Sequence, residues 1–107
     1  MLLEVTTTTG DRAIAERIAA ELVDKRLAAC VQITGPATSS YHWDGAIEIT
    51  EEWLCTAKSS DDHWGAIQEV VSRLHPYDVP ELIATEIVRV SDAYGAWLRR
   101  ELASVEG

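Results

Sequence analysis

Hydrophobic positions near the start of the chain change from a strand-like to a helical period. Leu2 to Thr8 is rich in β-branched threonine, which is typical of a strand. From Asp11 to Arg26 the pattern predicts an amphipathic helix. Its apolar stripe consists of Ile14, Ile18 and Leu22. Asp11 is a suitable cap, because its carboxylate can accept hydrogen bonds from the free amides of the first turn. The segment is therefore predicted to be a strand followed by a helix.

The middle of the chain has the pattern of two strands joined by a tight turn. Leu27 to Ile33 is a continuous apolar run that suits a buried strand. Gly35-Pro36 interrupts the strand, and because proline cannot donate to a strand ladder, we expect a bend or bulge there. Asp44-Gly45 tolerates the positive φ values of a type I′ turn and predicts a hairpin. The returning strand then covers Ala46 to Lys58.

The second half of the chain predicts a helix, a strand and a last helix. Ser59 to Asp62 supplies capping and acidic residues that favour a helix start, and Pro76 ends that helix. The apolar stripe of the helix consists of Trp64, Ile67, Val71 and Leu74. Leu82 to Val90 has the composition of a strand, and Ser91-Asp92 caps the last helix. The apolar face of that helix consists of Tyr94, Trp97, Leu98 and Leu102.

The resulting order, β-α-β-β-α-β-α, predicts an α+β, ferredoxin-like fold, in which a split βαβ pattern forms an antiparallel sheet and one helix is added at the C-terminus. In such a fold the helices cover one face of the sheet, and the other face is normally polar. Here apolar residues occupy both parities of several strands, as Leu82 and Ile83 do in the last one. We therefore expect a second subunit to cover the open face, which makes the protein a homo-oligomer. The alternative is that the last helix folds across that face.

Length, composition and charge narrow the function classes. The 107 residues suit a single domain, 1–107, and 47% apolar with 25% charged residues is ordinary globular usage. Nine basic against eighteen acidic residues give a net charge of −9, which disfavours nucleic acid and membranes as partners. The start lacks the basic region and apolar run of a signal peptide, and two cysteines without C-x-x-C spacing do not suggest a disulfide scaffold. A cytoplasmic location is the expectation.

Reactive and aromatic residues gather in two segments. One is Tyr41 to Gly45 at the hairpin, and the other is His75 to Glu81, a loop stiffened by two prolines. Neither contains a complete metal or catalytic motif. Cys30 has two interpretations, a small buried strand residue or a ligand. His75 could satisfy the last carbonyls of its helix or take part in a site.

The remaining candidates have structural interpretations. His63 lies beside two aspartates and is expected to be solvated, and Cys55 is expected to be a core residue. The strand glutamates are expected to form a solvated face; they are Glu48, Glu51 and Glu52. Trp43, at the hairpin tip, is hard to bury within its own subunit and is interpreted as an interface or cleft aromatic.

Several strings are specific when taken together. They are Leu27-Ala28-Ala29-Cys30-Val31, Tyr41-x-Trp43-x-Gly45, Lys58, His75-Pro76-Tyr77-Asp78-Val79-Pro80-Glu81 and Tyr94-x-x-Trp97-Leu98. In this order they resemble the CutA divalent-cation-tolerance family from the first strand to the last helix. The resemblance implies a ferredoxin-like subunit in a tight homotrimer similar to PII-type signalling proteins. It also implies a link to tolerance of copper and other divalent cations, with no established enzymatic activity.

The resemblance also implies roles for particular residues. Cys30 matches the cysteine proposed as a copper ligand in relatives, and we expect His75 and Glu81 to contribute to the metal site. The other matched residues belong to the inter-subunit cleft; they are Trp43, Lys58, Tyr77, Tyr94 and Trp97. Gln32 and Asp78 stand where the family usually has asparagine and glutamate. Cys55 has no regular counterpart and receives no role.

These observations lead to three hypotheses. The first is a cytoplasmic, trimeric metal-response protein that binds Cu(II) or a similar divalent cation weakly and needs no organic cofactor. Its ligands would be Cys30 or His75 with carboxylates at subunit boundaries. The second is a signalling trimer whose cleft holds a small anion through Lys58, His75 and Tyr77. An enzyme that uses His75 and Glu81 for acid–base chemistry ranks last.

Overall fold

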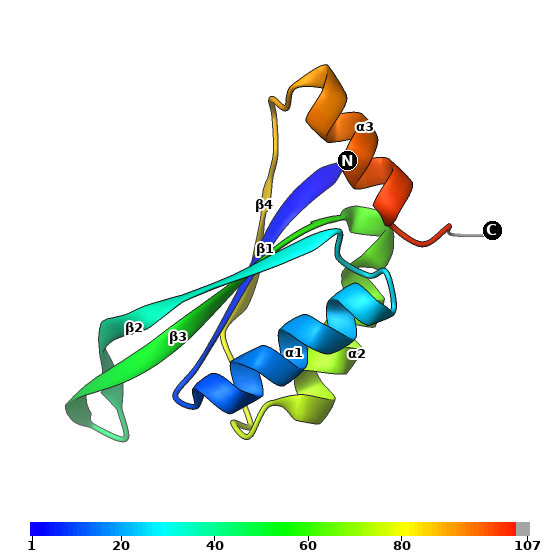
Figure 1. Cartoon of the computed structure of the whole chain (residues 1–107). Coiled ribbons are helices and arrows are strands. Elements are labelled where there is room, and N and C mark those ends of the chain that lie inside the picture. The colour runs from blue at the N-terminus through cyan, green and yellow to red at the C-terminus, as the bar shows by residue number, and fades with distance from the viewer. Residues whose placement is uncertain (105–107) are drawn as a thin grey trace.

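A computed structural model of the chain describes residues 1–104, and its elements follow the predicted order. They are β1 (Leu2–Thr9), α1 (Arg12–Asp24), β2 (Cys30–Trp43), β3 (Ala46–Ser60), the 3₁₀ turn η1 (Asp61–His63), α2 (Trp64–Leu74), β4 (Leu82–Glu86) and α3 (Asp92–Glu101). The four strands form one sheet in the order β2-β3-β1-β4, and every neighbouring pair is antiparallel. The predicted α+β, ferredoxin-like pattern with an added C-terminal helix is confirmed (Figure 1).

Helices α1 and α2 lie side by side against one face of the sheet and form the core with it (Figure 1). Helix α1 begins where predicted, because the Asp11 carboxylate accepts a hydrogen bond from the Ala13 amide at 2.8 Å. Ser91 caps α3 in the same way, by accepting from the Tyr94 amide. The buried cluster consists of Leu3, Val5, Ile18, Leu22, Ala28, Ala57, Ile67, Val70 and Val71.

The β2–β3 hairpin extends well beyond the helices (Figure 1). Its turn is the predicted one, with φ of 51° at Asp44 and 79° at Gly45, as a type I′ turn requires. The predicted irregularity at Gly35-Pro36 is a register shift between Thr34 and Ala37, and Gly35 is needed because a Cβ there would lie 2.7 Å from the Trp53 ring. We call residues 37–52, beyond this shift, the distal hairpin. It makes the molecule elongated, 45 × 26 × 22 Å, with a radius of gyration of 14.6 Å against about 13 Å for a compact chain of this length.

The open face of the sheet differs from the prediction. Leu3, Val5 and Ala57 belong to the core, so Glu4, Thr6 and Thr8 point away from the helices. Their β3 partners on that face are Lys58, Thr56 and Leu54. The open face is therefore largely polar on β1 and β3, where the expectation of two apolar faces was wrong, whereas on β4 the predicted Ile83 does lie on this face and is 55% exposed. Helix α3 does not cover this face; it lies at the end of the sheet near the N-terminus (Figure 1).

Three predicted boundaries shift for local reasons. Strand β2 begins at Cys30 instead of Leu27, because the amides of Leu27 and Ala28 both donate to the Leu22 carbonyl and wrap around the end of α1. Strand β4 ends at Glu86, four residues before the predicted end. Helix α2 begins at Trp64 after η1, and no side chain caps either start. Within residues 1–104, no helix combines the length and apolar character needed to span a bilayer.

Candidate functional site

The loop between α2 and β4 is fixed by His75. Helix α2 ends at Leu74, and His75 is already extended, with φ of −81° and ψ of 134°, as a residue before proline should be. Its Nδ1 accepts a hydrogen bond from the Tyr77 amide at 3.1 Å, so the proton is on Nε2, which donates to the Thr8 carbonyl at 2.6 Å. The Tyr77 ring packs edge-on against the imidazole, with centroids 4.7 Å apart.

This arrangement decides between the two interpretations of His75. Its ring bonds the end of β1 instead of the last carbonyls of its own helix. The single free lone pair, on Nδ1, accepts from the Tyr77 amide, and the side chain is buried, so neither nitrogen is open to a metal ion in this conformation. His75 thus acts as an anchor that fixes the loop against β1.

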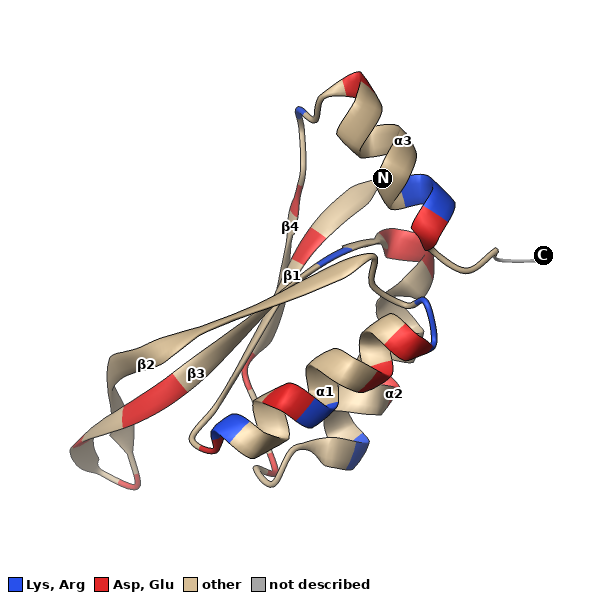
Figure 2. Cartoon of the chain, viewed as in Figure 1, with Lys and Arg blue, Asp and Glu red and all other residues tan. Residues whose placement is uncertain are grey.

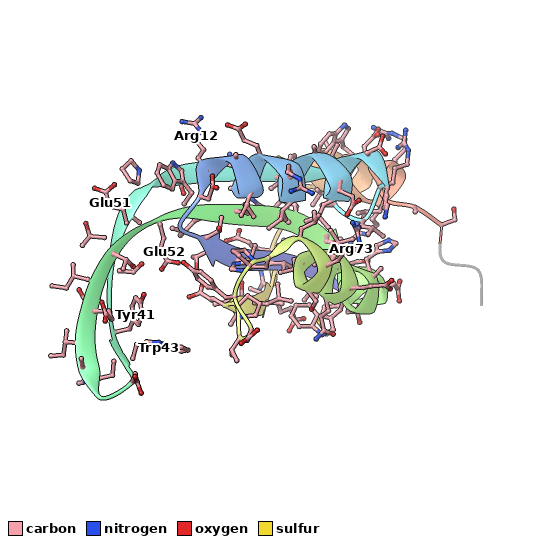
Figure 3. The ribbon with its side chains drawn as sticks, turned by 90° about the horizontal axis from the view of Figure 1, so that it is seen from below. Arg12, Tyr41, Trp43, Glu51, Glu52 and Arg73 are labelled. Atoms are coloured by element: carbon pink, nitrogen blue, oxygen red, sulfur yellow. The ribbon has the colours of Figure 1, made fainter. Side chains whose placement is uncertain are left out.

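A groove lies between the anchored loop and the distal hairpin, which arches over it. Its volume is about 720 Å³. Its lining comes from the end of β1, the inner face of the hairpin and the loop: Thr8, Ser39, Ser40, Tyr41, Trp43, Glu48, Glu52, Tyr77, Asp78, Val79 and Glu81. Figure 3 shows Tyr41, Trp43 and Glu52 on the inside of the arch and Glu51 on the outside.

The groove is strongly acidic. Four of its lining residues are carboxylates, and none is a lysine, arginine or histidine. The chain has no lysine or arginine between Arg26 and Lys58, so His42 is the one basic side chain of the distal hairpin, and it does not line the groove (Figure 2). A site lined in this way concentrates cations and repels anions.

Glu52 is the most unusual side chain of the groove. The residue is only 9% exposed, yet its carboxylate is not buried away from solvent, because within residues 1–104 the one fully buried side-chain oxygen or nitrogen without a partner is Thr7 Oγ1. The carboxylate lines the groove together with three others and no basic side chain, which favours a cation there. The sequence pattern predicted a solvated strand face, and this was wrong for Glu52. Side chains alternate between the two faces of a strand, so the sequence could have placed Glu48 and Glu52 on one face and Glu51 on the other.

The predicted metal ligands are not brought together within one chain. Glu81 lines the groove and His75 is buried behind it, whereas Cys30 lies opposite Lys58 in the register of β2 and β3. Within residues 1–104, no group of three or more histidine, cysteine, aspartate or glutamate side chains is close enough to hold a metal ion. A shared site of Cys30 and Glu81 would need a second subunit.

The predicted cleft residues separate into three places. Trp43 and Tyr77 line the groove. Lys58 lies elsewhere on the open face, 3.7 Å from the Glu4 carboxylate and 3.3 Å from the Gln32 side-chain oxygen. Tyr94 and Trp97 stack on each other in α3, with centroids 5.6 Å apart.

Two other titratable residues have structural positions. Cys55 is buried in the core as predicted, its Sγ donates to the Ala15 carbonyl at 3.5 Å, and burial raises the pKa of the thiol from 9.0 to about 11. It is therefore an unreactive thiol at neutral pH. His63 was expected to be solvated but is only 5% exposed, because it lies at the end of the sheet beside Leu2, Ser60 and Leu102.

Residues 3–101 match the family model described as CutA1 divalent ion tolerance protein. The chain belongs to this family. The divalent-cation tolerance protein CutA of Thermus thermophilus is 39% identical over 95 residues, which cover 89% of this chain and 92% of the relative.

Solved CutA structures share the fold. The divalent cation tolerance protein of Thermus thermophilus superposes with a TM-score of 0.93 at 37% identity, covering 96% of this chain and 100% of that one. The protein described as periplasmic CutA of Archaeoglobus fulgidus gives a TM-score of 0.90 at 31% identity, covering 94% of this chain and 98% of that one. The groove described above is thus carried by a CutA subunit.

Proposed function

We propose that this CutA chain acts in divalent-cation tolerance as a homotrimer and binds divalent cations weakly, Cu(II) among them, in the acidic groove. The observation that carries the proposal is a groove lined by four carboxylates and no basic residue, with Glu52 among them at only 9% exposure. No catalytic step is part of the proposal, because the family is one of tolerance proteins.

The groove chemistry supports weak cation binding more than tight coordination. Carboxylate oxygens are hard ligands that hold divalent cations with part of their water shell. Here the carboxylates lie on opposite walls, with Glu48 and Glu52 on the hairpin and Asp78 and Glu81 on the loop. Cys30 could add a soft ligand for copper only from a neighbouring subunit.

The distal hairpin supports the homotrimer. Ile47 and Ile49 are each 68% exposed on its outer face. In a lone chain, the apolar area of both side chains would stay in water, which is unfavourable. A neighbouring subunit that covers this face would bury them. The anionic-ligand hypothesis is weaker, because Lys58 lies outside the groove and His75 is anchored to Thr8.

Calorimetric titration of the purified protein with CuCl₂ and MgCl₂ tests the metal proposal. Glu52→Gln removes one of the four groove charges and should weaken binding about tenfold, since each carboxylate attracts the cation. Glu51→Gln removes the same charge from the next residue, which faces outward, and should leave the affinity unchanged. Equal affinities in Glu52→Gln and the native protein would overturn the groove assignment. The same titration of Cys30→Ser with CuCl₂ shows whether the thiol contributes to copper binding.

The cytoplasmic location is likewise a proposal. The two free cysteines are in keeping with a reducing compartment, whereas the Archaeoglobus relative is described as periplasmic. Immunodetection after separation of periplasm and cytoplasm tests it, and a periplasmic signal would contradict it.

A further inference from the structure

The hydrogen bonds of His75 make the loop that it holds sensitive to protonation. We propose that His75 is a pH-sensitive latch: the neutral imidazole holds residues 75–81 against β1, and proton uptake by the ring releases them. Both bonds of the ring are made within one chain. The latch therefore does not depend on how subunits assemble or on what the groove binds.

The bonding pattern of the ring requires its neutral form. Nε2 donates to the Thr8 carbonyl at 2.6 Å, and Nδ1 accepts from the Tyr77 amide at 3.1 Å. An imidazolium carries a hydrogen on each nitrogen and can accept no hydrogen bond. A proton on Nδ1 would point at the amide hydrogen of Tyr77, so the ring takes up a proton only when this bond has opened.

The site of the ring gives a positive charge no compensation. His75 is 7% exposed, and the Tyr77 ring packs edge-on against it with centroids 4.7 Å apart. Within residues 1–104, His75 takes part in no ion pair. A buried charge without a partner is unfavourable, so protonation favours the conformation in which the ring reaches water.

Charged groups on the surrounding elements are engaged elsewhere or line the groove. The end of β1 contributes only threonines, and the Asp11 carboxylate that follows it caps α1. Arg73 of α2 pairs with Glu21 of α1. The remaining carboxylates line the groove, which His75 does not; they are Glu52 of β3 and, on the loop itself, Asp78 and Glu81.

Opening of the loop and protonation of the ring are therefore linked. An imidazole that is free in water takes up a proton near pH 6.5. Protonation then stabilises the open loop, and its population should rise about tenfold between pH 7.5 and pH 5.5. Because the loop carries Asp78 and Glu81, opening would also withdraw two of the four groove carboxylates. This last consequence rests on the proposed function.

Hydrogen exchange of the Tyr77 amide, followed by NMR at these two pH values, tests the latch. Its protection relative to an unfolded peptide should fall about tenfold at the lower pH in the native protein. In His75→Asn, the side-chain oxygen can accept from the same amide but takes up no proton, so the protection should be equal at both pH values. His42→Asn removes an exposed histidine of the distal hairpin and should behave as the native protein. Equal protection in the native protein, or a tenfold loss in His75→Asn, overturns the inference.

The ring signals of isotope-labelled histidine test the latch in the native protein, without a variant. Protonation of the His75 ring should coincide with the loss of protection at Tyr77. A ring that becomes protonated while the Tyr77 amide stays protected overturns the inference. Calorimetric titration with MgCl₂ at the two pH values reports on the groove separately, and the affinity should be lower at pH 5.5 in the native protein but not in His75→Asn. A protein that binds no Mg²⁺ at either pH would overturn the proposed function, whereas the exchange of Tyr77 would still decide the latch.

Discussion

The two ends of the β2–β3 hairpin differ in how they bury their side chains. At the base of the hairpin, β3 lies beneath α1 and α2, and its residues Cys55 and Ala57 are 1% and 2% exposed. In the distal hairpin, Ile47 and Ile49 of the same strand are each 68% exposed. The two regions belong to the same pair of strands and have similarly apolar residues, so local sequence preference does not explain the difference.

The single chain therefore buries its apolar side chains at only one end of the molecule. The helix-covered half contains its own core, and its stability is a property of the single chain. The distal hairpin has exposed isoleucines on its outer face and carboxylates on its concave inner face. Isoleucines are normally buried against other apolar groups, and carboxylates normally pair with cations.

Replacing both Ile47 and Ile49 by threonine should remove the proposed homotrimer. Threonine keeps the β-branched shape, and the loss of two buried isoleucines would cost about 1.5–3 kcal/mol for each residue in each subunit. Light scattering after size exclusion should give about three times 11.8 kDa for the native protein and a smaller mass for the variant. Val23→Thr, at an exposed apolar position of α1, is the control. A trimeric double variant would place the interface elsewhere.

Ile18→Ala should destabilise the helix-covered half within each subunit. Ile18 is fully buried against the sheet, and truncating such a residue costs about 2–5 kcal/mol through lost burial and the remaining cavity. The measurement is the free energy of unfolding in urea. Val23→Ala, on the exposed side of the same helix, should change it by less than about 0.5 kcal/mol. Similar losses in both variants would show that the helix does not pack as described.

Stability should fall at alkaline pH because of Cys55. Its pKa is raised from 9.0 to about 11 by burial, so between these values the unfolded chain has lost the thiol proton while the folded chain keeps it. The folded state then binds more protons, and the free energy of unfolding decreases by about 2–3 kcal/mol as the pH rises through this window. Below pH 9 the contribution is fully present.

The check is the difference between the native protein and Cys55→Ala. Unfolding curves at several pH values should show a steeper alkaline loss for the native protein, because the variant lacks this thiol. Parallel pH profiles for the two proteins would contradict the assignment. Cys30, which is partly exposed, should react with a thiol reagent in the folded protein, whereas Cys55 should react only after unfolding.

The smallest effect concerns the start of α1. Asp11→Ala removes the carboxylate that accepts from the Ala13 amide and should cost about 1 kcal/mol. Asp24→Ala removes the same charge at the other end of the helix, where a carboxylate is unfavourable to the helix dipole, and should cost nothing. Equal urea midpoints for Asp11→Ala and the native protein would show that the cap contributes little.

Much of the fold could be predicted from the hydrophobic periodicity and from the residues that form turns and begin or end helices. The Asp44-Gly45 turn, the Asp11 cap and the stop at Pro76 each depend on chemistry within a few residues, and all three were right. Leu27 to Ala29 was misassigned to a strand, because an apolar run does not reveal that its amides close the end of a helix. Local patterns therefore located the elements better than their ends.

The candidate site was less predictable, since it depends on contacts distant in sequence. Parity alone places Glu52 on the same face of β3 as Glu48, but its burial requires the loop at residues 75–81 to face the hairpin. The buried state of His63 likewise depends on residues at both ends of the chain. The Nδ1 and Nε2 partners of His75 could not be predicted from spacing, because one of them is a backbone carbonyl 67 positions away.

The bond between His75 and Thr8 has a mechanical consequence. It joins the loop wall of the groove to β1, a central strand of the sheet, while the opposite wall is the distal hairpin, which continues from the sheet as two strands. We therefore expect the groove to change width through bending of the distal hairpin, because the loop is held to the sheet. A cation that binds both walls would restrict this bending. The Thr50 amide, near the middle of the hairpin, would then exchange more slowly with deuterium.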